Sequence, residues 1–584
     1  MRLRSINLAV AVLWFAVPGP ASIPQPTAPD LILHHGRILT VDALDREVEA
    51  IAIRGNRIVA LGSHTEVLRL AGATTRQIDL GGRTVTPGLL DAHAHFSGGA
   101  VERYFLLDVS YPAARSIADI VAAVRRRTDS LPAGTFVDGA GWDEGKFLER
   151  RMITAADLDA VSPRHPVVLQ NTTGHYSVVN SVALRLANIT RETADPPSGT
   201  IDRAADGTPT GVLKESAQRL VQRLVPPATA AQELEAMRAL GREFSAEGMT
   251  GLKDPGISAE TFERYRTLAA AGELPVRVFA LFSGGSSVAD AQRLIAARAA
   301  TARPYESVGD THVIAGGVKL FADGSGGART AWVYDEWNIG VTGVDRGNRG
   351  YPAMDPDTLR AMIRMYHGAG MHVSTHAIGD RTIDWVVESY AEALREKPTR
   401  GLRHGIIHAN IPTDHAIGLM QMLQRDFDAG YPEPSAAFHW WIGDNYAGNF
   451  GAARSRRLNP FATFASRGLI WANGSDFPVT PFPARHGLWA AVARSTMLGR
   501  YPGDPFGRDE AVDVRTALKS VTIWPARQMF LEREVGSLEV GKRADLAVWD
   551  RDPLRVPTAE LQGMRCLLTV FDGKVVFTAK GGPF

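Results

Sequence analysis

The chain has 584 residues, one cysteine, and 64 basic against 63 acidic side chains. A net charge of +1 argues against a polyanion-binding surface, so nucleic acid is not an expected partner. The single Cys566 excludes an intrachain disulfide framework and a cysteine-rich zinc site, so any metal must be held by nitrogen and oxygen ligands. At ~150 residues per domain the length predicts several domains, although α/β barrels run longer as one unit.

The first residues, 1–21, predict a secretory signal peptide. Arg2 and Arg4 precede an apolar run at residues 8–17, and small residues at 19–21 offer a cleavage site. The run is too short to cross a ~30 Å hydrocarbon core, which needs about twenty apolar residues. A retained membrane anchor is the alternative. We expect an exported protein, periplasmic or secreted, that has no membrane attachment after cleavage.

The two ends of the chain differ in pattern from its middle. Residues 30–83 and the last seventy or so residues read as short strands separated by glycine-containing turns. Between them, apolar strand-like runs alternate with helical patterns such as residues 117–128, which indicates βα units around a parallel sheet. The sequence therefore predicts an α/β fold, with a barrel inserted into a small β-sandwich that both termini build.

The strongest local motif is Asp91-Ala-His93-Ala-His95, which follows a strand-like run at residues 84–90. In a strand, residues i and i+2 point to the same face, so His93 and His95 can present two imidazoles to one ion. Imidazole suits zinc and other first-row metals. A lone pair of this kind is weak evidence in a chain with 16 histidines, so the interpretation depends on further ligands.

Four further candidates each end a separate strand-like run: Lys319, His376, His408 and Asp476. Barrel enzymes place catalytic groups at the carboxyl ends of their strands, where such residues converge. Each has a structural alternative when taken alone, such as helix capping by Asp476. Together and in this order they favour one metal site.

The spacing of these residues also fits a barrel. Successive gaps of 57, 32 and 68 residues separate Lys319, His376, His408 and Asp476, and a βαβ unit takes about 30 or more. The 224 residues from His95 to Lys319 exceed what three units need by roughly a hundred. We therefore expect an insertion after the first barrel strand that covers the mouth and shapes the substrate pocket.

Ordered motifs make the chain resemble the amidohydrolase superfamily, and within it the amidohydrolase-3 or YtcJ-like group. They are TPGLLDAHAHF, GWDEGKF, TTGHYSVVNS, GVKLFADGS, STHAIGDR, HGIIHAN, NGSDFPV and GSLEVGKRADLAV. The resemblance covers nearly the whole mature chain. It implies a distorted TIM (β/α)8 barrel, a β-sandwich from both termini, and metal-assisted hydrolysis of amide or other C–N bonds, as in N-substituted formamide deformylases.

The resemblance also implies roles for the candidate residues. The implied metal ligands are His93, His95, Lys319, His376, His408 and Asp476. Lys319 matches a bridging lysine, and we hypothesise that it is carbamylated and bridges two ions. An unmodified lysine beside a single ion is the alternative. The expected cofactor is a divalent metal, Zn²⁺ in the first instance, with one or two ions per chain. Asp476 would accept the water's proton and return it to the leaving nitrogen.

A second group of residues has weaker support. His175 is a candidate catalytic or substrate-binding residue, and Trp142 and Asp143 are candidate pocket residues, with plain packing as the alternative. Asp91 is a candidate partner of the metal ligands. Asp323, Asp380 and Arg381 are expected to shape loops. Histidines without a partner pattern are expected to be structural: His34, His35, His64, His165, His312, His367, His415 and His486.

These observations predict a β-sandwich from residues 22–85 and 526–584 around a barrel at residues 86–525, with the insertion at about residues 100–240. The predicted function is metal-dependent hydrolysis of a small-molecule amide or formamide. Two alternatives stay open: hydrolysis of an ester, lactone or carbamate at the same site, and a catalytically silent exported binding protein. An oligomer is compatible with the sequence, which carries no readable trace of the oligomeric state.

Overall fold

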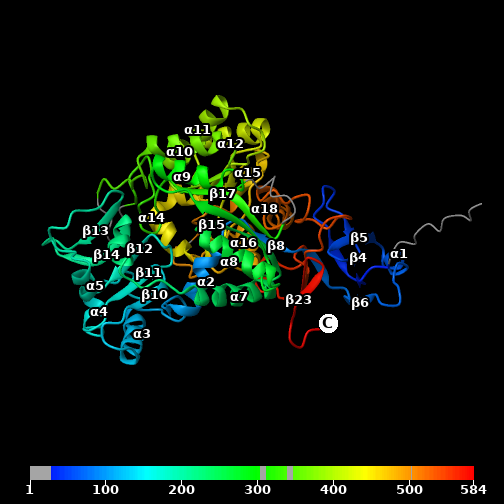
Figure 1. Ribbon diagram of the computed structural model, residues 1–584, viewed down its shortest axis with the longest axis horizontal. Coiled ribbons are helices and arrows are strands. Elements are labelled where there is room, and N and C mark those ends of the chain that lie inside the picture. Colours follow the sequence, from blue (N-terminus) through cyan, green and yellow to red (C-terminus); the bar gives the residue numbers. More distant parts are fainter. Residues whose placement is uncertain (1–27, 303–310, 339–345, 502) are drawn as a thin grey trace, which may run out of the picture.

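Seven parallel strands form the sheet at the centre of the molecule (Figure 1), in the order β20-β19-β18-β17-β16-β15-β8. The computed structural model describes residues 28–302, 311–338, 346–501 and 503–584. The strands are β8 (Leu89–Asp91), β15 (Met249–Ile257), β16 (Arg277–Ser283), β17 (Val313–Phe321), β18 (Val373–Ala377), β19 (Gly405–His408) and β20 (Tyr431–Glu433). They are apolar and buried along most of their length, as expected of a parallel sheet with both faces covered.

The sheet curls, and residues 472–476 lie between its first and last strands. The amide of Ala472 donates to the carbonyl of Pro432 in β20, at 3.2 Å. On the other side the amide of Ala92, which follows β8, donates to the carbonyl of Asn473, at 3.1 Å. This confirms the α/β class and a curled parallel half-barrel. The closed eight-stranded barrel stays a prediction.

Helices follow the strands in the alternation that the sequence predicts. They are α8 (Ala259–Ala270), α9 (Val288–Arg298), α10 (Pro356–Gly368), α11 (Asp380–Glu396), α12 (Asp414–Phe427) and α16 (Ala484–Ala493), and α7 (Ala230–Ala246) precedes β15. Side-chain caps fix where several begin: the Asp355 carboxylate accepts the Thr358 amide in α10, and the Thr413 hydroxyl accepts the Ala416 amide in α12. The apolar sides of these helices share one hydrophobic core with the sheet.

A second sheet lies between β8 and β15 in the chain and beside the parallel sheet in space (Figure 1). Its order is β13-β14-β12-β11-β10-β9, with strands β9 (Leu107–Asp108), β10 (Val137–Trp142), β11 (Val167–Asn171), β12 (Tyr176–Val179), β13 (Gly199–Arg203) and β14 (Pro209–Glu215). It has its own core, to which helix α3 (Ile117–Ser130) contributes Ile117, Ile120 and Val124. The predicted domain boundaries stay predictions.

Two further sheets lie at the opposite end of the molecule (Figure 1). One has the order β5-β4-β1-β6, with strands β1 (Leu31–His34), β4 (Ala50–Arg54), β5 (Arg57–Gly62) and β6 (Arg76–Asp79). The other has the order β23-β22-β21-β7-β2-β3, with strands β2 (Arg37–Leu39), β3 (Glu47–Val48), β7 (Thr84–Pro87), β21 (Leu546–Trp549), β22 (Cys566–Phe571) and β23 (Lys574–Thr578). Strands from both ends of the chain therefore pair in one sheet, and the two sheets share a hydrophobic core. The two-layer sandwich of the sequence analysis stays a prediction.

One buried ion pair joins the parallel sheet to the sheet of the two termini. The Arg277 guanidinium, in β16, donates to both carboxylate oxygens of Asp545, at 2.7 and 3.0 Å, and to Asp572 at 3.0 Å. Arg277 and Asp545 are almost completely buried. The predicted signal peptide lies outside the described residues. Within the described part of the chain, no helix is long and apolar enough to cross a membrane.

Candidate metal centre

His93 and His95 follow the end of β8, and their rings lie 5.1 Å apart. His93 is completely buried, whereas about a third of the His95 side chain is exposed. Burial, and then the charge of Lys319, hold the pKa of His93 well below its usual range. His93 is therefore a neutral imidazole near neutral pH, which is the form that binds a metal.

Three of the candidate histidines lie close to the carboxylate of Asp476. Its Oδ1 lies 3.1 Å from Nε2 of His93 and 3.4 Å from Nε2 of His95, and its Oδ2 lies 3.9 Å from Nε2 of His408. His408 is the last residue of β19, and its ring packs edge-on to that of His93 at 5.2 Å. Ligand atoms of His93, His408 and Asp476 all lie within 4.8 Å of one another. His93 lies more than 300 residues from the other two in the chain, and His408 and Asp476 are 68 residues apart.

Burial by itself would raise the pKa of Asp476, but His408, His93 and His95 outweigh it and hold the pKa well below the usual range. Asp476 is therefore ionised near neutral pH. A buried carboxylate that faces imidazole nitrogens can ligate a cation or accept a proton.

Lys319 lies near the carboxyl end of β17, with its side chain buried. Burial lowers the pKa of Lys319 to about 8, although Asp476 and Glu433 favour the charged form. Among the described residues its Nζ has no hydrogen-bond partner. A buried amine without a hydrogen-bond partner is unusual, because removing an unpaired polar group from water costs free energy.

His376 lies beside this group, but its Nε2 faces a backbone carbonyl and Asp323 rather than Asp476. Its ring is 4.7 Å from that of His408, while its Nε2 is 2.9 Å from the carbonyl oxygen of Gly324 and 3.5 Å from Oδ1 of Asp323. An imidazole that donates from Nε2 keeps a lone pair on Nδ1 for a metal. Asp323 also accepts the amide of Gly379, at 2.9 Å, so it shapes the loop after β18 as expected.

The residues present fit a divalent ion. Both ring nitrogens of His93, Nδ1 of His408 and Nζ of Lys319 are buried and lack a hydrogen-bond partner within the described ranges. Such atoms are rare in native proteins and call for a partner such as an ion. Nitrogen and oxygen donors of this kind are the ligand set expected of zinc and its neighbours. The residues whose ligand atoms lie close enough to share one ion are His93, His408 and Asp476. His95, His376 and Lys319 lie around them.

A carboxylate fixes the backbone on both sides of the centre. Asp91, at the end of β8, accepts the amide of His93 at 3.0 Å and the amide of Ser475 at 2.9 Å. It also accepts the Ser475 hydroxyl at 2.6 Å. Burial raises the pKa of Asp91 to about 7, and these hydrogen bonds favour the ionised form. Asp91 thus positions the residues next to His93 and Asp476.

The second sheet brings His175 to the centre. The ring of His175 lies 5.2 Å from that of His376, and its Nδ1 is 2.9 Å from Oε2 of Glu215. Burial works against protonation of His175, but the Glu215 carboxylate outweighs it and raises the pKa. Glu215 also accepts the hydroxyl of Thr330. The sequence analysis missed Glu215, which ends β14 with no motif around it.

Trp142 and Asp143 have mainly structural contacts. The Trp142 indole is completely buried in the core of the second sheet and donates to the carbonyl of Leu169 at 2.8 Å. Asp143 accepts the amide of Gly145 at 2.8 Å and lies 3.4 Å from Nζ of Lys146. These contacts agree with the packing alternative, and a role in binding substrate stays a prediction.

The sequence analysis also missed two buried carboxylates, Glu144 and Glu433. Glu144 accepts the hydroxyl of Tyr176 at 2.7 Å and an amide hydrogen of Asn445 at 3.1 Å. Glu433, the last residue of β20, is 2.7 Å from Nζ of Lys253 in β15. Lys253 had a usable signal, because only nine lysines occur in the chain and it ends a strand-like run just as Lys319 does.

Imidazole nitrogens and a carboxylate that converge at the carboxyl ends of parallel strands are typical of metal-dependent hydrolases whose site lies at the mouth of a βα barrel. The model of the amidohydrolase family matches residues 76–577. The chain belongs to the amidohydrolase family and is a hydrolase. This confirms the resemblance found in the sequence.

Two curated relatives match over almost the whole length of both chains. YtcJ of Bacillus subtilis is 30% identical over 553 residues, covering 94% of this chain and 99% of its own. An N-substituted formamide deformylase of Arthrobacter pascens is 30% identical over 564 residues, with the same coverage. Among solved structures, an uncharacterised metal-dependent hydrolase of Pyrococcus horikoshii has a TM-score of 0.68 and 22% identity, covering 91% of this chain and 99% of its own. That structure supports the fold.

Removing the Ser475 hydroxyl tests whether Asp91 positions the centre. We expect Ser475→Ala to weaken zinc binding about 10–100-fold, because partners that orient metal ligands have effects of this size. Competition with a chromophoric chelator measures the affinity. Ser389→Ala is the matched control, since Ser389 is also buried and donates to a carbonyl, that of Trp385 in α11. Equal zinc affinity in Ser475→Ala and wild type would contradict the role of Asp91.

Proposed function

We propose that the protein hydrolyses a C–N bond of a small, non-peptide amide or formamide at this centre. The observation that carries the proposal is the convergence of His93, His95 and His408 on the two carboxylate oxygens of Asp476, at 3.1, 3.4 and 3.9 Å. A divalent ion, Zn²⁺ in the first instance, would be held by His93, His95, His376, His408, Lys319 and Asp476. When bound, it supplies a water of lowered pKa and polarises the scissile carbonyl.

Asp476 is the proposed general base and acid. Its carboxylate is ionised and buried, and it faces the ligand nitrogens rather than the solvent. It accepts the proton of the attacking water and delivers it to the leaving nitrogen, which would otherwise depart as a poor anionic leaving group. We propose that His175, which contacts Glu215 and lies beside His376, donates a hydrogen bond to the substrate carbonyl as negative charge develops on it.

The formamide deformylase among the relatives supports the choice of a C–N bond. Hydrolysis of an ester, lactone or carbamate uses the same water and the same base, and it remains the second enzymatic candidate. The third candidate is a binding protein without activity. A panel of formamides, simple amides, lactones and carbamates, assayed with zinc-loaded protein, separates the three.

Substitution of Asp476 separates metal binding from chemistry. We expect Asp476→Asn to retain its metal and to lower turnover of the best panel substrate about 10²–10⁴-fold, the usual contribution of a general base. His93→Ala should lose the metal of this centre. Elemental analysis and steady-state kinetics give the two readouts.

Asp414→Asn is the matched control for Asp476→Asn, because Asp414 is exposed and pairs with Arg457 at the surface. It should leave both metal content and turnover unchanged. Near-normal turnover in Asp476→Asn would refute the assignment of the base, whatever the metal content.

We also propose that Lys319 is carbamylated and bridges two ions. Its buried and unpartnered Nζ supports this, because the added carboxylate would give it an anionic oxygen donor. Native mass spectrometry of protein prepared with bicarbonate should show the mass of one added carboxyl group. Lys319→Ala should lack that mass and hold less metal. An unmodified wild-type mass with a single ion would establish the alternative of a lysine beside one metal.

The N-terminal pattern supports a third proposal, that the protein is exported and that its signal peptide is removed. Expression of the full chain in a Gram-negative host, followed by fractionation and N-terminal sequencing, tests it. We expect periplasmic protein that begins near residue 22. Full-length protein in the membrane fraction would favour a retained anchor instead.

A further inference from the structure

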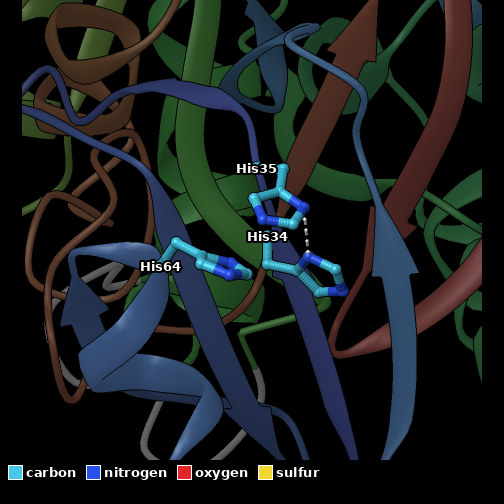
Figure 2. Close-up of side chains that lie close together, drawn as sticks. All are labelled: His34, His35 and His64. Carbon is cyan, nitrogen blue, oxygen red and sulfur yellow. Dashed lines mark hydrogen bonds between the residues drawn. The ribbon is translucent and has the colours of Figure 1, made fainter.

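Three histidines that the sequence analysis left as structural lie together in the N-terminal sheet (Figure 2). His34 ends β1, His35 follows it, and His64 begins helix α1 (His64–Leu68). Their ligand atoms lie within 4.8 Å of one another. The expectation that they lack a partner pattern is therefore wrong. They belong to the terminal sheets, whereas the proposed catalytic centre lies at the parallel sheet (Figure 1).

The backbone at His35 brings the first two rings together. In a regular strand the side chains of neighbouring residues point to opposite faces, so His34 and His35 would be separated. His35 instead has a φ of +53°, a left-handed conformation that is uncommon outside glycine. The two rings consequently meet edge-on, with 4.8 Å between their centres. Strained backbone of this kind clusters at binding sites.

Distances between the donor atoms suit a small cation. Nδ1 of His34 and Nδ1 of His35 are 3.2 Å apart, and Nδ1 of His35 is 2.9 Å from Oδ2 of Asp79. Two ligand atoms of a tetrahedral zinc ion, each about 2.05 Å from it, lie about 3.3 Å apart. Asp79 is placed here because it pairs with His34 across the parallel β1–β6 ladder. The three imidazoles thus lie within reach of one ion, and the Asp79 carboxylate, which contacts His35, would supply a fourth ligand.

Hydrogen bonds alone leave this cluster poorly satisfied. Nδ1 of His35 carries at most one hydrogen, and that hydrogen would have to serve both Asp79 and His34. His64 stacks on His35 with ring centres 3.5 Å apart, and its buried Nδ1 has no hydrogen-bond partner among the described residues.

We propose that His34, His35, His64 and Asp79 form a second binding site for a divalent transition metal ion, separate from the catalytic centre. A ligand set made mainly of imidazoles favours zinc, copper or nickel over magnesium or calcium. The His35 and Asp79 side chains are about half exposed, at 48% and 59%, so an ion can enter from solvent. The ion would tie the end of β1 to the start of α1 and to β6. The site also adds one equivalent to any metal count made on the whole protein.

The experiment counts zinc in two complementary variants of the full chain. Wild type, His64→Gln and His93→Ala are loaded with zinc, freed of excess by gel filtration, and analysed for metal. His64→Gln should hold one equivalent less than wild type and keep wild-type turnover. His93→Ala should lose the metal of the catalytic centre and keep the equivalent bound by the histidine cluster.

His415→Gln is the matched control, because His415 also pairs with a carboxylate, Glu388 at 3.0 Å, on an exposed surface away from the cluster. It should hold as much zinc as wild type. Equal zinc in His64→Gln and wild type, or an equal loss in His415→Gln, would overturn the proposal.

Asp79→Asn provides a second variant in case His64→Gln does not fold. Asparagine keeps the side-chain oxygen that accepts the Gly81 amide, so the turn after β6 is preserved. We expect zinc at the cluster to bind at least tenfold more weakly in Asp79→Asn, as measured by chelator competition on the His93→Ala background. Unchanged affinity there would exclude Asp79 and the four-ligand site.

Discussion

The Asp91 carboxylate links the first strand of the parallel sheet to the segment that follows its last strand. It accepts the amide of His93 on one side and both the amide and the hydroxyl of Ser475 on the other. These hydrogen bonds fix Ser475 next to Asp91, although the two residues are 384 positions apart in the chain. Because Asp476 follows Ser475 directly, the same carboxylate sets the distance between the proposed base and its nearest imidazole. The centre therefore depends on how these two segments are held together, which in turn depends on a buried carboxyl group. Burial raises the pKa of Asp91 to about 7, and these hydrogen bonds favour its ionised form.

The long segment between β8 and β15 folds as the second sheet and contributes a residue to the side of the centre that the parallel sheet does not form. The helices that follow the other strands pack against the outside of the sheet, whereas this segment folds as a sheet with its own core. Its contribution to the centre is His175, which Glu215 holds in place from β14. The proposed ligands thus come from the strand ends, and His175, which lies beside them, comes from the segment between β8 and β15. In such an arrangement the metal chemistry can stay constant while substrate preference changes with the inserted sheet.

Sequence patterns predicted the parts of the site that have a local signature. His93 and His95 follow from a period of two after an apolar run, and Lys319 and His408 from their place at strand ends. The partners could not be predicted in this way. Glu215 contacts His175 across 40 residues, and no pattern in either segment specifies the other. The N-terminal histidine cluster was hidden for a related reason: strand periodicity places His34 and His35 on opposite faces, and only the left-handed backbone at His35 overrides it. Local rules fail here because tertiary contacts fix the conformation.

A comparison of two buried lysines bears on the chemistry of the centre. Lys253 and Lys319 lie in β15 and β17 of the same curled sheet, and both are almost completely excluded from solvent. Lys253 is neutralised by Glu433, 2.7 Å away, in the way that buried charges are normally accommodated. Lys319 has no such partner in the described structure, although its surroundings are just as closed.

Folding does not explain Lys319, because an apolar side chain of the same length would fill the space without the cost of desolvating an amine. A lysine at this position is explained if its nitrogen is converted to a metal ligand. A carbamate would turn the unpaired amine into an anion beside neutral imidazoles, and a divalent ion would then balance it. Lys253 and Glu433 satisfy each other within the protein, whereas the proposed carbamate would satisfy Lys319 with a group from outside the chain.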